Sequence, residues 1–186
     1  MQRVILLISW LMCLALGACA PTEAVKRGGS AELGKAIAGL GSGVDPDEAA
    51  RAAQIAYQHT DDLALAYQIT DPPLVHNTKV NLGLKPRGLC WHWAEDMEKR
   101  LKMEGFDTLQ VHRAIANADN PFRIDHSTAI ISARGDDMTD GIVLDPWRMG
   151  GKLFWAPLRE DTRYNWVPRT EVLAAKYETA AFKSAR

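Results

Sequence analysis

The chain has 186 residues, of which 47% are hydrophobic, and its 22 basic and 23 acidic side chains give a formal net charge of −1. This composition excludes a disordered, low-complexity or collagen-like chain, and the length suits one domain whose core needs no disulfide bonds. The near-neutral charge provides no broad basic field, so we expect no nucleic acid among the partners of this protein.

The first residues have the pattern of an export signal. Arg3 precedes an uncharged apolar run at residues 4–18, which is shorter than the about 20 residues of a membrane-spanning helix and typical of a signal-peptide core. The run ends in the sequence LGAC at residues 16–19, which resembles the lipobox of bacterial lipoproteins. The alternative is a plain signal peptide or a membrane anchor that happens to contain a cysteine.

The lipobox resemblance implies a division of the chain. Residues 1–18 would be the lipoprotein signal peptide, and Cys19 would carry the lipid and become the first mature residue. Such an anchor makes the membrane a partner, because its acyl chains bury methylene groups in the bilayer. Ala20, and not Asp, follows the cysteine, which resembles lipoproteins sent on to the outer membrane. We therefore expect a domain attached to the cell envelope, at the outer membrane and facing the periplasm.

A tether and a long helix come next. Residues 19–45 mix Gly, Ser and Ala with scattered charge, which predicts a flexible tether with a brief helical turn at 31–40. Asp45 and Pro46, followed by two acids, predict the start of a helix that runs to about residue 67. The folded domain is expected to span residues 46–186.

A loop separates this helix from a second one. Two prolines after Asp71 end the first helix, and the composition of residues 71–88 predicts a loop. From Leu89 apolar residues recur at helical spacing, and Gly105 is placed to end the helix. Cys90 falls in the first turn of this helix.

After Gly105 the apolar period changes to two, which predicts strands. The expected strands lie at residues 109–113, 124–130, 141–144 and 152–156, and a closing helix lies at 170–177. Helices followed by a run of strands favour an α+β fold with an antiparallel sheet over a wound parallel sheet.

The cysteine count leaves one thiol in the domain. Cys13 lies in the signal peptide and Cys19 is the expected lipid site, so Cys90 has no internal partner for a disulfide bond. An unpaired thiol in an exported protein is either reactive or a small buried hydrophobic residue.

Cys90, His126 and Asp145 form a candidate catalytic set. A helix N-terminus favours a thiolate over a thiol, which makes a cysteine there a better nucleophile. A histidine on a neighbouring strand can move the proton, and an aspartate one strand further can hold the other ring nitrogen. The set therefore has the residue types of a catalytic triad, provided that the fold brings them together.

Three segments around these residues resemble the transglutaminase-like, papain-related cysteine enzymes. GLCWHWA at residues 88–94 is similar to the nucleophile helix of that superfamily, HSTAII at 126–131 to its histidine strand, and GIVLDPW at 141–147 to its aspartate strand. The resemblance implies a transglutaminase-like core, with N-terminal helices before an antiparallel sheet and the nucleophile at a helix N-terminus. It also implies Cys90 as nucleophile, His126 as general acid/base and Asp145 as orienting acid.

The same resemblance implies an activity. Enzymes of this superfamily attack an amide or ester carbonyl with a thiolate, form a thioester and release it to water or to an amine. We therefore expect a thiol hydrolase or acyltransferase without a cofactor, acting on a peptide or protein; location alone suggests cell-wall peptides. Because some members have lost their catalytic residues, a non-catalytic binding or scaffold lipoprotein is the alternative.

An oxyanion in such a reaction needs hydrogen-bond donors. The backbone N–H of Cys90 is the natural one, and side-chain candidates from the preceding loop are His76, Asn77 and Asn81. No motif selects among these side chains, and His76 is otherwise expected to be solvated.

The residues next to the catalytic set have two interpretations each. Trp91 and Trp147 either wall a substrate cleft or pack the core. Arg148 either binds a substrate carboxylate or, as we expect, pairs with a surface acid.

A metal site is a competing interpretation of the same region. Cys90 and His92, together with His126, offer metal-binding atoms, but no ligand pair has the spacing of a structural zinc site. We therefore expect no metal. Since His92 is two residues past the cysteine, we expect it to face away from the thiol, on the surface.

Overall fold

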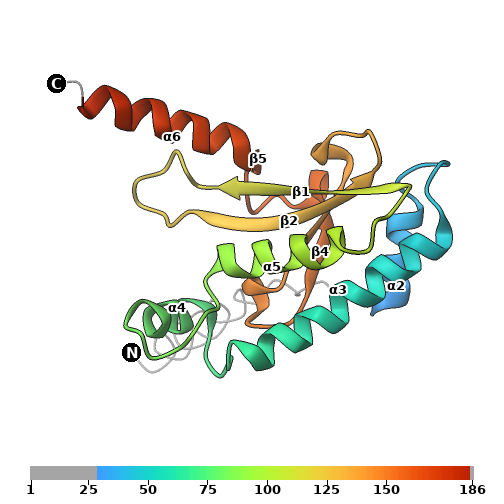
Figure 1. The fold of residues 1–186 in the computed structure, drawn as a ribbon, viewed down its shortest axis with the longest axis horizontal. Coiled ribbons are helices and arrows are strands. Elements are labelled where there is room, and N and C mark those ends of the chain that lie inside the picture. The colour runs from blue at the N-terminus through green and yellow to red at the C-terminus, as the bar shows by residue number, and fades with distance from the viewer. Residues whose placement is uncertain (1–28, 185–186) are drawn as a thin grey trace, which may run out of the picture.

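A computed structural model describes residues 29–184, and the expected signal peptide and lipid site lie outside these residues. The described chain is α+β, as expected, with helices followed by an antiparallel sheet and a closing helix (Figure 1). Its helices are α2 (Ser30–Ala38), α3 (Pro46–Ala66), α4 (Pro73–Asn81), α5 (Cys90–Lys102) and α6 (Arg169–Ser184).

The sheet has five antiparallel strands in the order β4-β3-β2-β1-β5. The strands are β1 (Leu109–Ala116), β2 (His126–Ala133), β3 (Ile142–Asp145), β4 (Phe154–Pro157) and β5 (Val167–Pro168). β1 and β2 pair along their full length, and both edge strands, β4 and β5, contain a proline. Three short 3-10 helices connect the later elements: η2 (Met138–Asp140), η3 (Trp147–Met149) and η4 (Leu158–Glu160).

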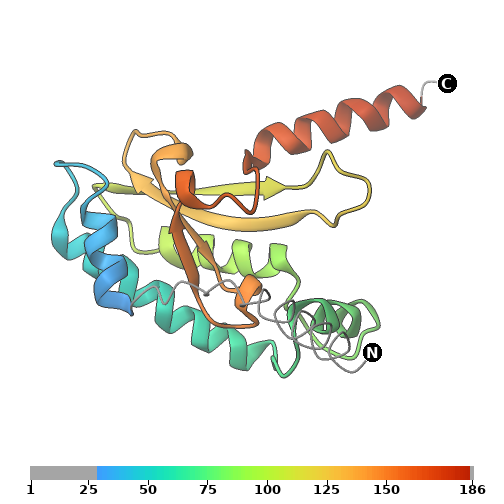
Figure 2. The same cartoon turned by 180° about the vertical axis from the view of Figure 1, so that it is seen from behind.

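Helices cover one side of β1 and β2. α5 lies along these strands, α3 packs on α5, and α2 packs on α3 (Figures 1 and 2). The main core lies among these elements and includes the fully buried Ile37, Met97, Leu101 and Ile131. α6 follows β5 at the β1 edge of the sheet and extends away from it, with residues 174–180 exposed (Figure 2).

The start of α3 agrees with the sequence prediction. The Asp45 side chain accepts hydrogen bonds from the backbone N–H groups of Asp47 at 2.7 Å and Glu48 at 3.0 Å. Pro46 occupies the first helical position, where a missing N–H has no cost. α3 is thereby fixed at its first turn and presents an alanine-rich face to the core.

The helical turn predicted at 31–40 agrees with α2, but the flexible tether predicted around it is wrong for these residues. Residues 30–38 form α2, whose Leu33 and Ile37 are 0% exposed and belong to the main core. Gly34 permits close packing, because a Cβ on it would lie 3.3 Å from Cα of Ala50 in α3. The folded domain therefore begins before residue 46. The glycines that suggest a flexible linker in the sequence serve helix packing here.

The predicted loop at 71–88 is also partly wrong. Pro73 begins α4, which runs to Asn81. A proline pair ends one helix but is equally suited to the first turn of the next, where its fixed φ is already helical. Within the described part of the chain, no helix is both long and apolar enough to cross a membrane.

Candidate active site

The helix that carries Cys90 begins at a tightly constrained turn. Gly88 has φ +121°, a conformation that L side chains rarely adopt, and a Cβ on it would lie 2.4 Å from Nε2 of His76. His76 is 1% exposed, with Nε2 2.9 Å from the carbonyl oxygen of Arg87. The expectation of a solvated His76 is therefore wrong, because this ring fills the space that the glycine leaves.

His92 fixes the same turn from inside α5. Its Nδ1 accepts hydrogen bonds from the backbone N–H groups of Gly88 at 3.1 Å and Leu89 at 3.2 Å. Burial and the positive charge of Arg87 lower the pKa of His92, which keeps Nδ1 unprotonated and able to accept. His92 is buried, so its predicted surface position is wrong. N–H groups that precede a helix need an acceptor, and this ring supplies it.

Cys90 is the first residue of α5 and is 7% exposed. Its thiol donates a long hydrogen bond to the carbonyl oxygen of Asp125, with 3.5 Å between sulfur and oxygen. Within the described residues, the backbone N–H groups of Cys90 and Trp91 have no acceptor, as is normal for the first turn of a helix. The sulfur therefore lies at the positive end of a helix, beside free N–H donors.

His126 is the first residue of β2, and Asp145 is the last residue of β3. Both side chains are 1% exposed, and Nε2 of His126 lies 2.6 Å from Oδ2 of Asp145. Nδ1 of His126 is buried and has no hydrogen-bond partner of ordinary geometry among the described residues. Cys90 lies near enough to the ring to influence its pKa. Nδ1 is thus the nitrogen left to exchange a proton with the sulfur.

The surroundings of His126 favour its charged form. Burial lowers the pKa of this imidazole, but the charge and hydrogen bond of Asp145, together with the Cys90 side chain, raise it to about 9. Burial alone would raise the pKa of Asp145. The charges and hydrogen bonds of His126 and Arg148 have a larger, opposite effect, so the pKa of Asp145 is lowered overall. At neutral pH the two side chains therefore form a buried imidazolium–carboxylate pair.

Arg148 holds Asp145 from the other side. Its backbone N–H and its Nε donate to the two oxygens of Asp145 at 3.1 and 3.0 Å, and its terminal nitrogens donate to Asp161 at 2.9 and 2.7 Å. Nε1 of Trp166 also donates to Asp161, at 2.9 Å. Arg148 therefore pairs with acids, as predicted, but the prediction of a surface acid is wrong, because its own side chain is 6% exposed and both partners are buried. Sequence reasoning missed Asp161 and Trp166 as members of this network.

Three aromatic rings enclose the imidazole. The ring centroids of Trp147, Tyr164 and Trp166 lie 4.7, 4.7 and 5.3 Å from that of His126. Trp147 is 8% exposed, and its Nε1 donates to Oδ1 of Asn77 at 3.0 Å. Trp147 therefore walls the histidine and ties α4 to the site, and Asn77 serves as its acceptor.

A hollow of about 270 Å³ opens at the Cys90 sulfur. Trp91, 46% exposed, forms part of its wall, which is the position predicted for a cleft residue. Trp147 does not line it, and Asn81 is exposed at the end of α4, away from the lining. The lining consists of Cys90, Trp91, Glu95, Arg113, Ile115, Asp125, Ser127, Arg169 and Leu173.

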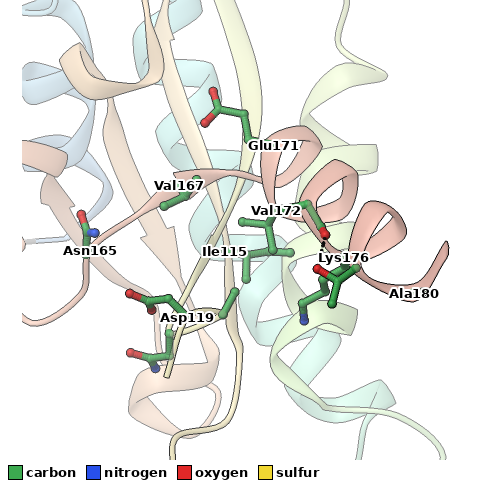
Figure 3. Close-up of a pocket in the computed structure, with 12 residues that line it drawn as sticks. Ile115, Asp119, Asn165, Val167, Glu171, Val172, Lys176 and Ala180 are labelled. Carbon is green, nitrogen blue, oxygen red and sulfur yellow. Dashed lines mark hydrogen bonds between the residues drawn. The ribbon is translucent and has the colours of Figure 1, made fainter. Parts of the chain in front are cut away.

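A larger hollow, of about 730 Å³, lies between the end of β1 and α6 (Figure 3). Its lining includes Asp119, Glu171 and Lys176 but none of the three candidate catalytic residues. Ile115 borders both hollows. An ion pair joins Asp125, which lines the smaller hollow, to Lys176, which lines the larger one. The two spaces are therefore neighbours, separated by Ile115 and this ion pair.

Among residues 29–184, no group of three or more His, Cys, Asp or Glu side chains is arranged to hold a metal ion.

A comparison with protein-family models, curated proteins and solved structures finds no match to this chain. The described fold places a buried Cys, His and Asp at the junction of a helix and a sheet.

Proposed function

We propose that this protein is a cysteine enzyme that acts on an amide bond through a thioester. Cys90 is the nucleophile, His126 the general acid/base and Asp145 the orienting acid. The observation that supports this is the buried imidazole, bonded through Nε2 to Asp145 at 2.6 Å and left with Nδ1 unpaired beside Cys90. Within the described residues, Nδ1 of His76 is also buried and without a partner, so what marks His126 is the position of its free nitrogen beside Cys90 together with the bond to Asp145.

The proposed reaction moves one proton and no net electrons. The proton of the Cys90 thiol is held on Nδ1 of His126, whose raised pKa favours the imidazolium, and the thiolate adds to the carbonyl carbon. Nδ1 then gives the proton to the leaving nitrogen, the C–N bond breaks, and a thioester and an amine result. Water attacks the thioester next, with its proton passing through Nδ1 to sulfur, and a carboxylic acid leaves. An amine in place of water gives acyl transfer.

Two backbone donors suit the oxyanion of this reaction. The N–H groups of Cys90 and Trp91 are free of acceptors within the described residues and lie at the start of α5. Negative charge that develops on the carbonyl oxygen is stabilised by fixed dipoles aimed at it. None of the three predicted side-chain donors is required in this arrangement.

The proposal extends to the family and the location. The order of nucleophile helix, histidine strand and aspartate strand, with an antiparallel sheet, supports a transglutaminase-like, papain-related core. We place the enzyme on the cell envelope through a lipid on Cys19, at the outer membrane facing the periplasm, because of the lipobox-like sequence at 16–19. Peptides, including those of the cell wall, are the substrates that this location offers.

The first test measures the reactivity of Cys90 in the full chain. Iodoacetamide labelling at pH 7 is followed by mass spectrometry of the peptide that contains Cys90, so that Cys13 and Cys19 do not contribute. We expect His126→Ala and His126→Gln each to slow this labelling about tenfold or more, because the imidazolium no longer stabilises the thiolate.

The control is His112→Ala, which removes a half-buried histidine that bonds Ser132 at 2.8 Å. Labelling as fast in both His126 variants as in the wild type would contradict the proposal. It would favour the alternative, a binding or scaffold protein in which Cys90 only packs.

A further inference from the structure

The hollow beside Cys90 contains acidic groups that are already paired. Glu95 bonds Lys99, with 3.1 Å between nitrogen and oxygen, and Arg87 lies 3.5 Å from its other oxygen. Asp125 is paired with Lys176. Each carboxylate of the lining therefore has a basic partner that is not itself part of the lining.

Two guanidinium groups line the same hollow and have donors to spare. Arg113, with a side chain 10% exposed, donates from one terminal nitrogen to Glu98 at 3.2 Å and from the other to the carbonyl oxygen of Trp91 at 3.4 Å, and its buried Nε has no partner among the described residues. Glu98 also accepts from Lys102 at 2.8 Å, so it is shared between two cations. The exposed side chain of Arg169 forms no hydrogen bond or ion pair within residues 29–184.

We propose that Arg113 and Arg169 form a subsite for a carboxylate of the substrate, one residue or less from the scissile carbonyl. This inference rests on the proposed function, since it places the carboxylate next to the sulfur that would be acylated. Guanidinium groups bind carboxylates through parallel N–H donors and are the usual choice for this recognition. The substrate class is thus an amide whose neighbouring group is acidic.

Arg113 and Arg169 also line a third hollow, of about 600 Å³, which does not include Cys90. The size and charge of the two hollows described above agree with a subsite beside Cys90. About 270 Å³ lies below the about 300–1,000 Å³ of sites for drug-sized ligands, so it suits a single residue-sized group. In the larger hollow, the carboxylates of Asp119 and Glu171 outnumber the one ammonium, Lys176, which is already paired. An anionic group is therefore accommodated beside Cys90 and is disfavoured in the larger hollow.

Two alkylating agents of similar size test the subsite directly. Iodoacetate carries a carboxylate and iodoacetamide a neutral amide, and both react with Cys90 in the full chain without needing a substrate. The quantity measured is the ratio of the two labelling rates at the Cys90 peptide. We expect Arg169→Gln to lower this ratio about 3- to 10-fold, as the loss of a charge-assisted contact requires.

The matched control is Arg159→Gln, which removes an exposed arginine that pairs with Asp140 outside the hollow. An unchanged ratio of labelling rates in Arg169→Gln would overturn the subsite. An equal fall of the ratio in Arg169→Gln and Arg159→Gln would also overturn it, because the effect would then come from the net charge of the protein alone. Arg113→Gln, in samples whose fold is verified by circular dichroism, is expected to lower the ratio as well.

This experiment separates the subsite from the catalytic proposal. His126→Ala is expected to slow iodoacetamide as well as iodoacetate, whereas Arg169→Gln is expected to slow iodoacetate and leave iodoacetamide nearly unchanged. If His126→Ala has no effect while Arg169→Gln lowers the ratio, the anion subsite exists on a protein whose thiol is not activated. The reverse result leaves an activated thiol without a carboxylate subsite.

Discussion

At the scale of single residues, the pair of His126 and Asp145 makes stability depend on pH. The pKa of His126 is raised to about 9 in the fold, above the about 6.5 of an unfolded chain. Its contribution is therefore fully present below about pH 6.5 and is lost as pH rises through about 9. Asp145 has a lowered pKa, so its contribution is present above the unfolded value of about 3.9 and is lost as pH falls below it.

We expect the free energy of unfolding to fall by roughly 2–3 kcal/mol between pH 6.5 and 9.5, since one pKa unit corresponds to about 1.36 kcal/mol. Asp145→Asn should flatten this dependence, because the carboxylate charge that raises the histidine pKa is gone. Urea unfolding over this pH range measures it, and in a Cys90→Ala background the fall should be smaller, because the Cys90 side chain also raises the pKa of His126.

Asp140→Asn is the control for this measurement, because Asp140 pairs with Arg159 on the surface. It should retain the wild-type pH dependence. An equally steep fall in Asp145→Asn would mean that the histidine does not carry the effect.

The sequence predicts some of these residues better than others, for a physical reason. Cys90, His126 and Asp145 lie at the ends of a helix and two strands, and such ends are marked locally by glycine, proline and apolar periodicity. Arg148 lies near Asp145 in the chain, but its second partner, Asp161, follows β4. Because such segments come into contact only when the sheet has formed, the local sequence does not predict the contact.

At the scale of elements, the entry to α5 determines where the sulfur lies. Gly88 has φ +121°, and a Cβ at this position would overlap the His76 ring. Gly83 has φ +71°, but a Cβ there would have no other atom within 4 Å. The two glycines thus separate the cost of backbone strain from the cost of steric overlap.

We expect Gly88→Ala to lower the free energy of unfolding by roughly 3 kcal/mol or more, because strain and overlap with the His76 ring add. Gly83→Ala should cost only about 1 kcal/mol, from strain alone. Urea unfolding of the two variants measures the difference. Equal losses would show that the His76 ring moves aside freely.

Two elements are predicted poorly or not at all because their composition is ambiguous. α2 is expected only as a brief helical turn within a tether, since it is rich in small residues and is stabilised by packing on α3, an effect that intrinsic propensity does not include. α4 has weak amphipathic character and only His76 buried in the described structure, so apolar periodicity does not reveal it. α3 has a strong N-cap at Asp45, and both α3 and α5 have long apolar faces, so these two helices are predicted within a few residues.

At the scale of the whole molecule, α2 makes the N-terminal segment part of the folding unit. Leu33→Ala should lower the free energy of unfolding by about 2–5 kcal/mol, as expected for a large-to-small change in a packed core. Lys35→Ala, on the exposed side of the same helix, should change it by less than about 0.5 kcal/mol. A flexible tether at these residues would make both changes neutral in thermal or urea unfolding.

The proposed anchor gives a second prediction at this scale. Cys19→Ser should abolish incorporation of a labelled fatty acid and move the protein from the membrane fraction to the soluble fraction, because each buried methylene contributes about 0.8 kcal/mol to membrane binding. Cys13→Ser, inside the expected signal peptide, should leave both unchanged. Lipid labelling that persists in Cys19→Ser would contradict the assigned site.

The prolines of the two edge strands have a consequence for crowding. Pro157 ends β4 and Pro168 ends the two-residue β5, and a proline offers no N–H to an incoming strand. The sheet therefore presents short, interrupted edges to neighbouring copies. Proteins held side by side on a membrane surface meet at high local concentration, and edges of this kind keep such encounters from growing into intermolecular sheets.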